Sequence, residues 1–173
     1  MNTAALERHR KERDVFFGEH YASPLPEADM ERFDGLWYFA PDPRWRLVGS
    51  WAPAPEDARV DVVASTGTTS AYRLAGWVEV DIAGESYRMA VLDDGDGGWF
   101  IPFRDATCGR STYPGGRYVP VEIDGRTAVV DFNYASNPYC AYDEEFSCPL
   151  PPPGNMLPVP VEAGERDYRP PRR

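Results

Sequence analysis

Residues 77–91, with the sequence WVEVDIAGESYRMAV, carry the clearest fold signal in the chain. Apolar Val78, Val80 and Ile82 alternate with Glu79 and Asp81, and this period of two is typical of a half-buried strand. The alternation resumes after a glycine, so the stretch predicts a β-hairpin with a type II′ turn at Gly84-Glu85. This register pairs Ile82 with Tyr87, Val80 with Met89, Val78 with Val91, and Asp81 with Arg88.

A second hairpin is predicted around Asp124-Gly125, a dipeptide that favours a two-residue type I′ turn. Pro120 has no N–H to donate, so the first strand of this hairpin is expected at an edge or at a bulge. The predicted register pairs Val121 with Ala128, Val119 with Val130, Tyr118 with Asp131, and Glu122 with Thr127.

The rest of the chain adds short strands and little helix. Strands are predicted at residues 36–39, 45–51, 60–64 and 99–103 and near 159–161, and a helix at 3–20, capped by Thr3 and followed by a short turn to Met30. From Asn133 on, the sequence is non-periodic and rich in proline. The fold class is therefore mainly β, an antiparallel β-barrel or sandwich of eight or nine short strands with an N-terminal helix.

We expect one β domain over residues 33–165, with residues 1–32 packing on it as a helical segment and residues 166–173 forming a frayed tail. The chain has 173 residues, of which 42% are hydrophobic, and a net charge of −10. That charge disfavours nucleic acid and anionic membranes as partners, since both require a basic face. There is no membrane span or apolar signal segment, so a cytoplasmic location is expected. The oligomeric state is left open.

The three cysteines are Cys108, Cys140 and Cys148, and seven residues separate the last two. This spacing matches no common zinc motif, and the two histidines, His9 and His20, are far away in sequence. No metal and no cofactor is predicted, and a Cys-His nucleophile is disfavoured. Free thiols are the default in a reducing cytosol, with a Cys140–Cys148 disulfide as the alternative.

Polar side chains concentrate in residues 104–118 and 131–140. The predicted register places Tyr118 opposite Asp131, with Arg117 adjacent, so the two segments are expected to meet at one end of the sheet. An arginine, carboxylates and aromatic rings there could form a pocket for a small polar or anionic molecule. The candidate ligand-binding residues are Arg104, Asp105, Thr107, Tyr113, Arg117, Asp131, Asn133, Asn137, Tyr139 and Cys140.

The same residues also have a purely structural interpretation. Asp and Asn side chains cap turns, and Arg117 could form an ion pair with Asp105 or Asp131 that holds the long loop. Two further functions stay open: a hydrolase or isomerase with Asp105 or Asp131 as general acid or base, and a non-catalytic scaffold that docks a partner through residues 150–160. Whether the protein is an enzyme is therefore undecided; there is no G-x-S-x-G elbow, phosphate loop or dinucleotide fingerprint.

Several short motifs occur along the chain: FIPFRDAT at 100–107, TY at 112–113, GRY at 116–118, DFN at 131–133, NPYCAY at 137–142, CPLPP at 148–152 and AGE at 163–165. Together they resemble an uncharacterised prokaryotic family, domain of unknown function 1684, in its short form. The resemblance covers nearly the whole chain and is most specific in the C-terminal half. It gives no activity and no catalytic residues, but it implies that the two polar segments belong to one motif system, which favours a shared pocket. Position 108, where relatives more often have serine, departs from the pattern, which argues against a ligand role for Cys108.

Overall fold

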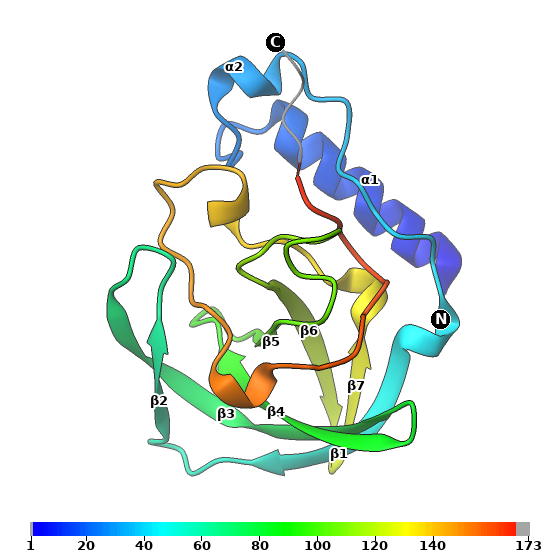
Figure 1. Ribbon diagram of the computed structural model, residues 1–173, viewed down its shortest axis with the longest axis vertical. Coiled ribbons are helices and arrows are strands. Elements are labelled where there is room, and N and C mark those ends of the chain that lie inside the picture. The colour runs from blue at the N-terminus through cyan, green and yellow to red at the C-terminus, as the bar shows by residue number, and fades with distance from the viewer. Residues whose placement is uncertain (1, 169–173) are drawn as a thin grey trace.

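The computed structural model describes residues 2–168 and consists of seven β-strands with helices at the N-terminus (Figure 1). Fewer strands form than the eight or nine expected, because residues 36–39 and 159–161 lie in extended chain that makes only isolated contacts with its neighbours. The strands are β1 (Arg46–Pro53), β2 (Arg59–Val63), β3 (Thr69–Ile82), β4 (Glu85–Asp93), β5 (Trp99–Phe103), β6 (Arg117–Asp124) and β7 (Thr127–Asp131).

Six of these strands close into an antiparallel barrel, which confirms the predicted fold class. The order is β1-β7-β6-β5-β4-β3, and β3 pairs back onto β1. β2 stands outside the ring and pairs with the first half of β3. A register shift between Leu74 and Gly76 lets β3 leave β2 and join the barrel. A Cβ at Gly76 would lie 2.4 Å from the carbonyl oxygen of Ala52, so glycine is required where β3 passes β1.

The first hairpin forms, but its predicted register is wrong by two residues. Its turn is Ala83-Gly84, so Ile82 pairs with Glu85, Val80 with Tyr87 and Val78 with Met89. Both turn residues have positive φ, 57° and 86°, which is the type I′ pattern. Glu79, rather than Asp81, lies opposite Arg88. A shift of two residues keeps every side chain on its face, so the alternating pattern could not distinguish the registers.

The second hairpin differs from its prediction in the same way. The turn residues are Gly125 and Arg126, and Asp124 pairs with Thr127. Only Gly125 has positive φ, as in a type II′ turn. Val121 therefore pairs with Val130, and Ile123 with Ala128. Tyr118 does not pair with Asp131; its backbone instead forms an isolated bridge with Ser136.

The barrel interior is filled by the inward-facing residues of all six strands. Residues at alternate positions are fully buried and form one cluster, to which the C-terminal chain adds Leu157, Val161 and Ala163. The interior is therefore core, and any ligand site must lie outside it. The largest members include Met89, Ile101, Phe103 and Phe132.

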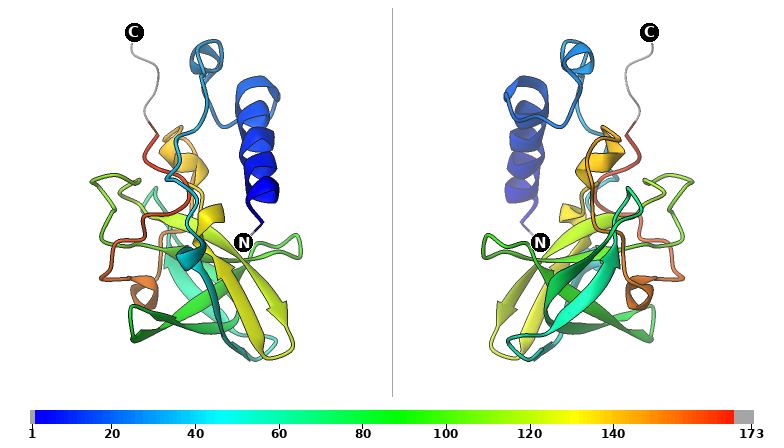
Figure 2. Two further views of the ribbon diagram at one scale, coloured as in Figure 1. Left: turned by 90° about the vertical axis from the view of Figure 1, so that its right-hand side faces the viewer. Right: turned by 90° about the vertical axis from the view of Figure 1, so that its left-hand side faces the viewer.

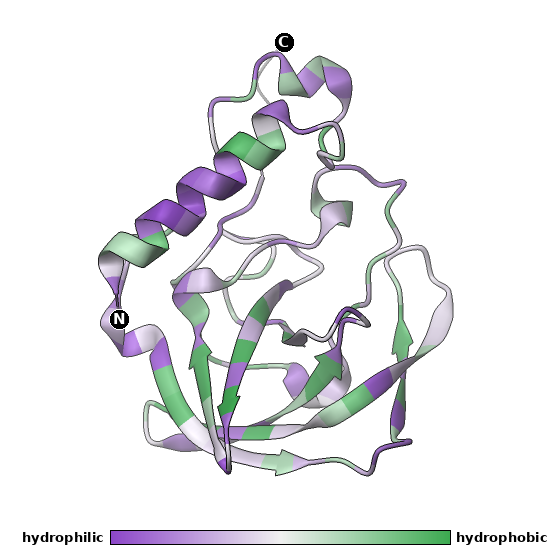
Figure 3. Ribbon diagram, turned by 180° about the vertical axis from the view of Figure 1, so that it is seen from behind, coloured by the Kyte–Doolittle hydropathy of each residue, from purple (hydrophilic) through white to green (hydrophobic). Residues whose placement is uncertain are grey.

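The predicted N-terminal helix is α1 (Thr3–Glu19), with Asn2 rather than Thr3 as its cap, since Asn2 accepts a hydrogen bond from the Ala5 amide. A short α2 (Glu27–Met30) follows. α1 lies outside one end of the barrel (Figure 2), and Leu6 and Phe17 are its buried contacts. Its middle is hydrophilic and its apolar residues lie toward its two ends (Figure 3). No helix within residues 2–168 has the length and hydropathy to cross a membrane.

After β7 the chain continues through short 3-10 turns, η2 (Phe132–Tyr134), η3 (Tyr139–Ala141) and η4 (Pro153–Asn155). Residues 149–165, here named the C-terminal segment, then run along the barrel. Asn155 holds η4 there by hydrogen bonds with both backbone groups of Ala90 and with the Pro102 carbonyl. Of the predicted tail, Arg166 donates its backbone N–H to Trp37, whereas residues 169–173 lie outside the described part of the chain.

Candidate functional site

A cavity of about 550 Å³ lies where α1 approaches the barrel, and we name it the α1 cleft. Residues from α1, β3, the β4–β5 loop, β5, β6 and the chain after β7 surround it. The cleft therefore exists only because the barrel and α1 come together. Its walls consist of His9, Arg13, Tyr72, Asp94, Gly98, Trp99, Phe100, Tyr118, Pro120, Tyr134, Ser136 and Pro149.

Aromatic rings dominate the walls of the α1 cleft. Phe100 and Tyr118 are neighbours on β5 and β6, with ring centroids 5.0 Å apart. Trp99 stacks on Trp51, with centroids 5.3 Å apart and an interplanar angle of 23°. The Tyr118 hydroxyl donates to the Pro149 carbonyl at 2.6 Å, so the ring is fixed to the C-terminal segment. All of the lining rings are half-buried.

Two side chains of α1 supply the polar side of the cleft. The His9 ring lies 5.0 Å from the Tyr134 ring. Burial, together with the charges of Arg13 and Arg10, lowers the pKa of His9. The imidazole is thus neutral at pH 7 and can both donate and accept a hydrogen bond. Arg13 brings a positive charge, and its side chain is 21% exposed.

Arg13 also attaches α1 to the barrel. Its guanidinium donates to the Glu165 carboxylate at 3.0 Å, and the Glu165 side chain is 1% exposed. Burial lowers the pKa of Arg13, but the neighbouring Glu165 charge raises it overall, so this arginine remains charged. Glu165 also accepts hydrogen bonds from the Tyr142 hydroxyl and from Asn137. This buried polar cluster fixes the distance between α1 and the barrel.

The candidate residues Arg117, Asp105 and Thr107 lie in the interior. Arg117 is fully buried and donates to the carbonyl oxygens of Val161, Ala163 and Glu165. It also lies 3.5 Å from the Asp105 carboxylate. Asp105 accepts the Val161 amide at 2.6 Å and the Thr107 hydroxyl at 2.9 Å. This arrangement corresponds to the structural interpretation, in which an ion pair holds a loop.

The two candidate asparagines also bind protein groups. Asn133 exchanges two hydrogen bonds with the backbone of Asp42, at 2.9 and 2.8 Å. Asn137 donates to Glu165 and to the Arg166 carbonyl. Each asparagine thus joins the chain after β7 to a distant segment.

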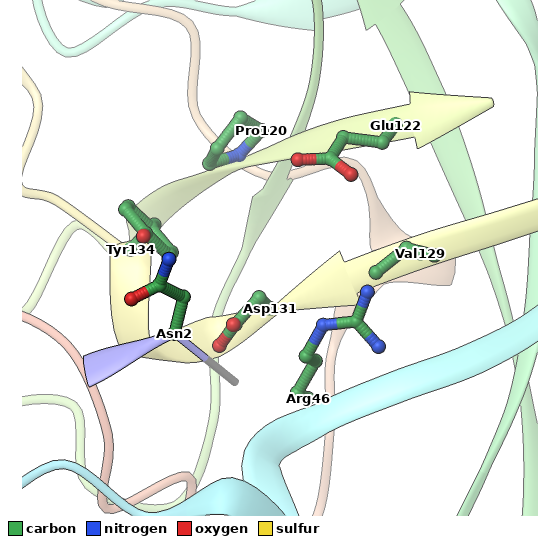
Figure 4. Close-up of a pocket in the computed structure, with 7 residues that line it drawn as sticks. All are labelled: Asn2, Arg46, Pro120, Glu122, Val129, Asp131 and Tyr134. Atoms are coloured by element: carbon green, nitrogen blue, oxygen red, sulfur yellow. The ribbon is translucent and has the colours of Figure 1, made fainter. Parts of the chain in front are cut away.

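Asp131 contributes to a second cavity, of about 370 Å³ (Figure 4). Figure 4 shows Arg46 of β1, Glu122 of β6 and Asp131 of β7 around it. Asp131 also accepts hydrogen bonds from the backbone and side chain of Asn133. Among the described residues, Asp105 and Asp131 have no hydrogen-bond partner in common, and the strand pairing places Asp131 opposite Arg46. Pro120 and Tyr134 line both this cavity and the α1 cleft.

The remaining candidates lie elsewhere on the molecule. Arg104 is exposed and uses its backbone to bind Asn155 and Leu157. Tyr139 is 41% exposed and packs on Phe146. Tyr113 and Cys140 contact each other, with the tyrosine hydroxyl 3.7 Å from the sulfur.

The walls of the α1 cleft draw on the two polar segments that the sequence singles out, but on other side chains of those segments. Tyr118, Tyr134 and Ser136 of the α1 cleft fall in the two predicted segments, which the Tyr118–Ser136 bridge joins. The α1 cleft, as the described residues form it, contains none of the individual candidates. Nothing in the sequence pattern identified His9, Arg13, Tyr72, Trp99 or Phe100 as residues that line a cavity. The aromatic run at 99–103 is the one sequence feature that could have indicated an aromatic wall, but the pattern predicts only a strand there.

Three comparisons relate the chain to other proteins. A family model described as a protein of unknown function, DUF1684, matches residues 31–166. The chain is similar to the solution NMR structure of an uncharacterized protein from Haloarcula marismortui. The two are 38% identical, the match covers 95% of this chain and 93% of that one, and the TM-score is 0.74. No curated protein matches.

Proposed function

This chain belongs to the DUF1684 family of proteins of unknown function, and from that starting point we propose that it binds a small planar molecule in the α1 cleft. The proposal keeps the predicted class, a β-rich protein that binds a small polar or anionic ligand. It changes the residues that form the site. The aromatic rings of the barrel would contact the faces of the ligand, and His9 and Arg13 would bind its polar or anionic edge.

The observation that carries the proposal is the gathering of half-buried rings around one cavity. The volume of about 550 Å³ is in the range of small-molecule sites. Five aromatic residues from four elements, β3, β5, β6 and η2, line the same space: Tyr72, Trp99, Phe100, Tyr118 and Tyr134. A planar ligand would cover their remaining apolar surface, and each aromatic contact would add about 0.5–1.5 kcal/mol beyond that burial.

The polar side of the cleft favours a ligand with oxygen atoms at one edge. Arg13 contributes a positive charge that Glu165 partly balances. Neutral His9 offers one donor and one acceptor. The carboxylate of Asp94 is already used within its own loop, where it accepts the amides of Asp96 and Gly98 at 2.9 and 2.8 Å. An anionic edge would therefore be oriented toward α1.

The proposal can be tested by fluorescence titration with 8-anilinonaphthalene-1-sulfonate, which carries a planar naphthalene ring and an anionic sulfonate. We expect saturable binding of one molecule per chain and a higher unfolding temperature in its presence, because the dye would bind the native state. Tyr72→Ala should weaken binding about tenfold, which corresponds to about 1.4 kcal/mol. Tyr72 is suited to this test because it lines the cleft from β3 and is only half-buried, at the margin of a small core cluster of Val62, Leu74 and Leu92.

Tyr139→Ala is the matched control, since Tyr139 is an exposed tyrosine outside the α1 cleft. It should bind the dye as the unchanged protein does. The proposal fails if both variants bind equally well. It fails also if the dye lowers the unfolding temperature, because the dye would then bind exposed core of a partly unfolded state.

A further inference from the structure

A second group of reactive side chains lies outside the α1 cleft, around Cys140 and Cys148. Cys140 belongs to η3, and Cys148 begins the CPLPP motif. The Cys148 sulfur accepts a hydrogen bond from the Cys140 amide at 3.3 Å. Rings at the two ends of the loop also meet, with the centroids of Tyr139 and Phe146 5.4 Å apart. The loop thus brings both thiols to one place.

Neighbouring chain segments hold this loop in position. The Cys148 amide donates to the Ser65 hydroxyl at 3.1 Å, and the Ser65 amide donates to the Cys148 carbonyl at 2.8 Å. The Tyr113 hydroxyl lies 3.7 Å from the Cys140 sulfur and 3.4 Å from the Cys140 carbonyl. Both cysteines are free thiols.

The surroundings give the two sulfurs different ionisation. A hydrogen bond from the Cys148 thiol, with further ones from Ser65 and Tyr113, lowers the pKa of Cys140 to about 6 against the opposing effect of burial. The same bond, together with burial, raises the pKa of Cys148. At pH 7 the Cys140 sulfur is therefore the more ionised of the two. An ordinary thiol with a pKa of about 8.5 is only about 3% ionised at that pH.

A small molecule can approach Cys140 although the residue is only 6% exposed. Two cavities, of about 340 and 240 Å³, have Cys140 in their walls, and both also include Tyr113 and Glu144. A thiolate beside a hydroxyl donor, with a second thiol next to it, is the arrangement expected of a cysteine that reacts with peroxide.

We propose that Cys140 is an oxidation site at which a peroxide forms a sulfenic acid, and that Cys148 converts this group to an intramolecular disulfide. The Cys140 thiolate attacks one peroxide oxygen. The S–O bond forms, the O–O bond breaks, and the other oxygen leaves as hydroxide or alkoxide. The Cys148 sulfur then attacks the Cys140 sulfur, the S–O bond breaks, and the Cys148 proton leaves with the hydroxyl as water. Two thiols are oxidised and one peroxide is reduced.

Cys108 serves as an internal control on the same chain. Its thiol donates to the Asp105 carboxylate at 3.5 Å and accepts from the Thr112 hydroxyl at 3.8 Å. Because its thiol is engaged by a carboxylate and a hydroxyl, Cys108 should react more slowly than Cys140 although it is the more exposed residue.

The first experiment treats the unchanged protein with hydrogen peroxide at pH 7 and follows intact mass and peptide maps. We expect the mass to fall by two hydrogen atoms and the peptides that contain Cys140 and Cys148 to become linked. When the protein is treated with limiting iodoacetamide, Cys140 should be alkylated at least about tenfold faster than Cys108. Equal rates for the two residues, or added oxygen without a link, would overturn the proposal.

Variants then separate the two roles. In Cys148→Ser the sulfenic acid at Cys140 should persist and be trapped by dimedone. In Cys140→Ser, neither Cys148 nor Cys108 should react with peroxide as fast as Cys140 does in the unchanged protein. Cys108→Ser should behave as the unchanged protein does. If Cys140→Ser forms a dimedone adduct at Cys148 as fast as the unchanged protein is oxidised, then the assignment of the two roles is wrong. Circular dichroism of each variant confirms that it is folded.

Discussion

Arg117 fastens the C-terminal segment to the barrel through a buried charge. Its guanidinium donates hydrogen bonds to the carbonyl oxygens of Val161, Ala163 and Glu165. The Asp105 carboxylate accepts a hydrogen bond from the Val161 amide. Gly116 makes this position possible, because a Cβ there would lie 2.5 Å from the Phe103 carbonyl oxygen. The GRY motif thus has a clear structural purpose.

We expect Arg117→Met to destabilise the protein by about 3–5 kcal/mol, the range for breaking a buried ion pair by removal of one partner. Urea unfolding measures this change. The variant leaves three carbonyls and the Asp105 carboxylate without their partner. Under conditions in which the variant is folded, it should bind the dye as the unchanged protein does, because Arg117 does not line the α1 cleft.

Arg110→Met is the control, since Arg110 is exposed and its loss should change stability by less than about 0.5 kcal/mol. Equal stability of the two variants would contradict the structural role of Arg117. Loss of dye binding from folded Arg117→Met would instead favour a ligand role for this residue.

At this scale the sequence identified a group of connected polar residues but not what they bind. Arg117, Asp105 and Asn137 all have partners in the C-terminal segment or the residue after it, at separations of more than 25 residues. Such separations depend on the path of the chain through space. The type of a side chain indicates that it needs a partner when buried, but not which partner it has.

The two hairpins show what alternation does and does not determine. It placed β3, β4, β6 and β7 and their inward faces correctly. Turn chemistry suggested central residues that are one position too late in the first hairpin and one too early in the second. Both errors shift the pairing by two residues and preserve the faces, so the buried residues were right although the partners were wrong.

Ala83→Asn tests the turn of the first hairpin. Ala83 has a φ of 57°, a left-handed conformation that costs an alanine roughly 1–2 kcal/mol. Asn-Gly is the preferred type I′ dipeptide, so the substitution should stabilise the protein by about 0.5–1 kcal/mol in urea unfolding. If the turn were Gly84-Glu85, residue 83 would be an extended strand position and asparagine would lower stability instead.

Within residues 2–168, one ion pair, Arg13–Glu165, attaches α1 to the barrel side of the molecule. Hydrogen bonds of Arg10 and Asp14 and the buried Leu6 and Phe17 add to it. Glu165→Gln leaves the Arg13 charge without its counter-ion, and we expect α1 to open more often than the barrel does. Hydrogen exchange of the α1 amides should then be about tenfold faster or more, with the barrel amides little changed.

The exposed residue Glu162 supplies the matched control, Glu162→Gln, which should leave exchange in α1 unchanged. A uniform increase over barrel and helix in Glu165→Gln would show that α1 is not a separate unit. Dye binding should weaken in Glu165→Gln, because His9 and Arg13 would leave the wall of the cleft for part of the time.

The molecule as a whole is a barrel with a filled interior, so the cleft that we propose as its ligand site lies on the outside of the barrel. Closure requires β1 to pair with both β3 and β7. Neither strand follows β1 directly in the chain, and no local sequence pattern predicts these two pairings. The α1 cleft has the same origin, since its walls come from residue 9 to residue 149. Local patterns therefore predicted the class and most elements, whereas barrel closure and the cleft required the three-dimensional path.

The most direct test of the α1 cleft is a two-dimensional ¹H–¹⁵N NMR titration of the labelled protein with 8-anilinonaphthalene-1-sulfonate. The protein has five tryptophans, so the Trp99 indole signal can be assigned by substitution. We expect the largest shifts at the Trp99 indole and at the amides of Tyr72, Phe100, Tyr118 and Tyr134. Shifts centred instead on Arg46, Glu122 and Val129, or no saturable shift at all, would contradict a ligand site in the α1 cleft.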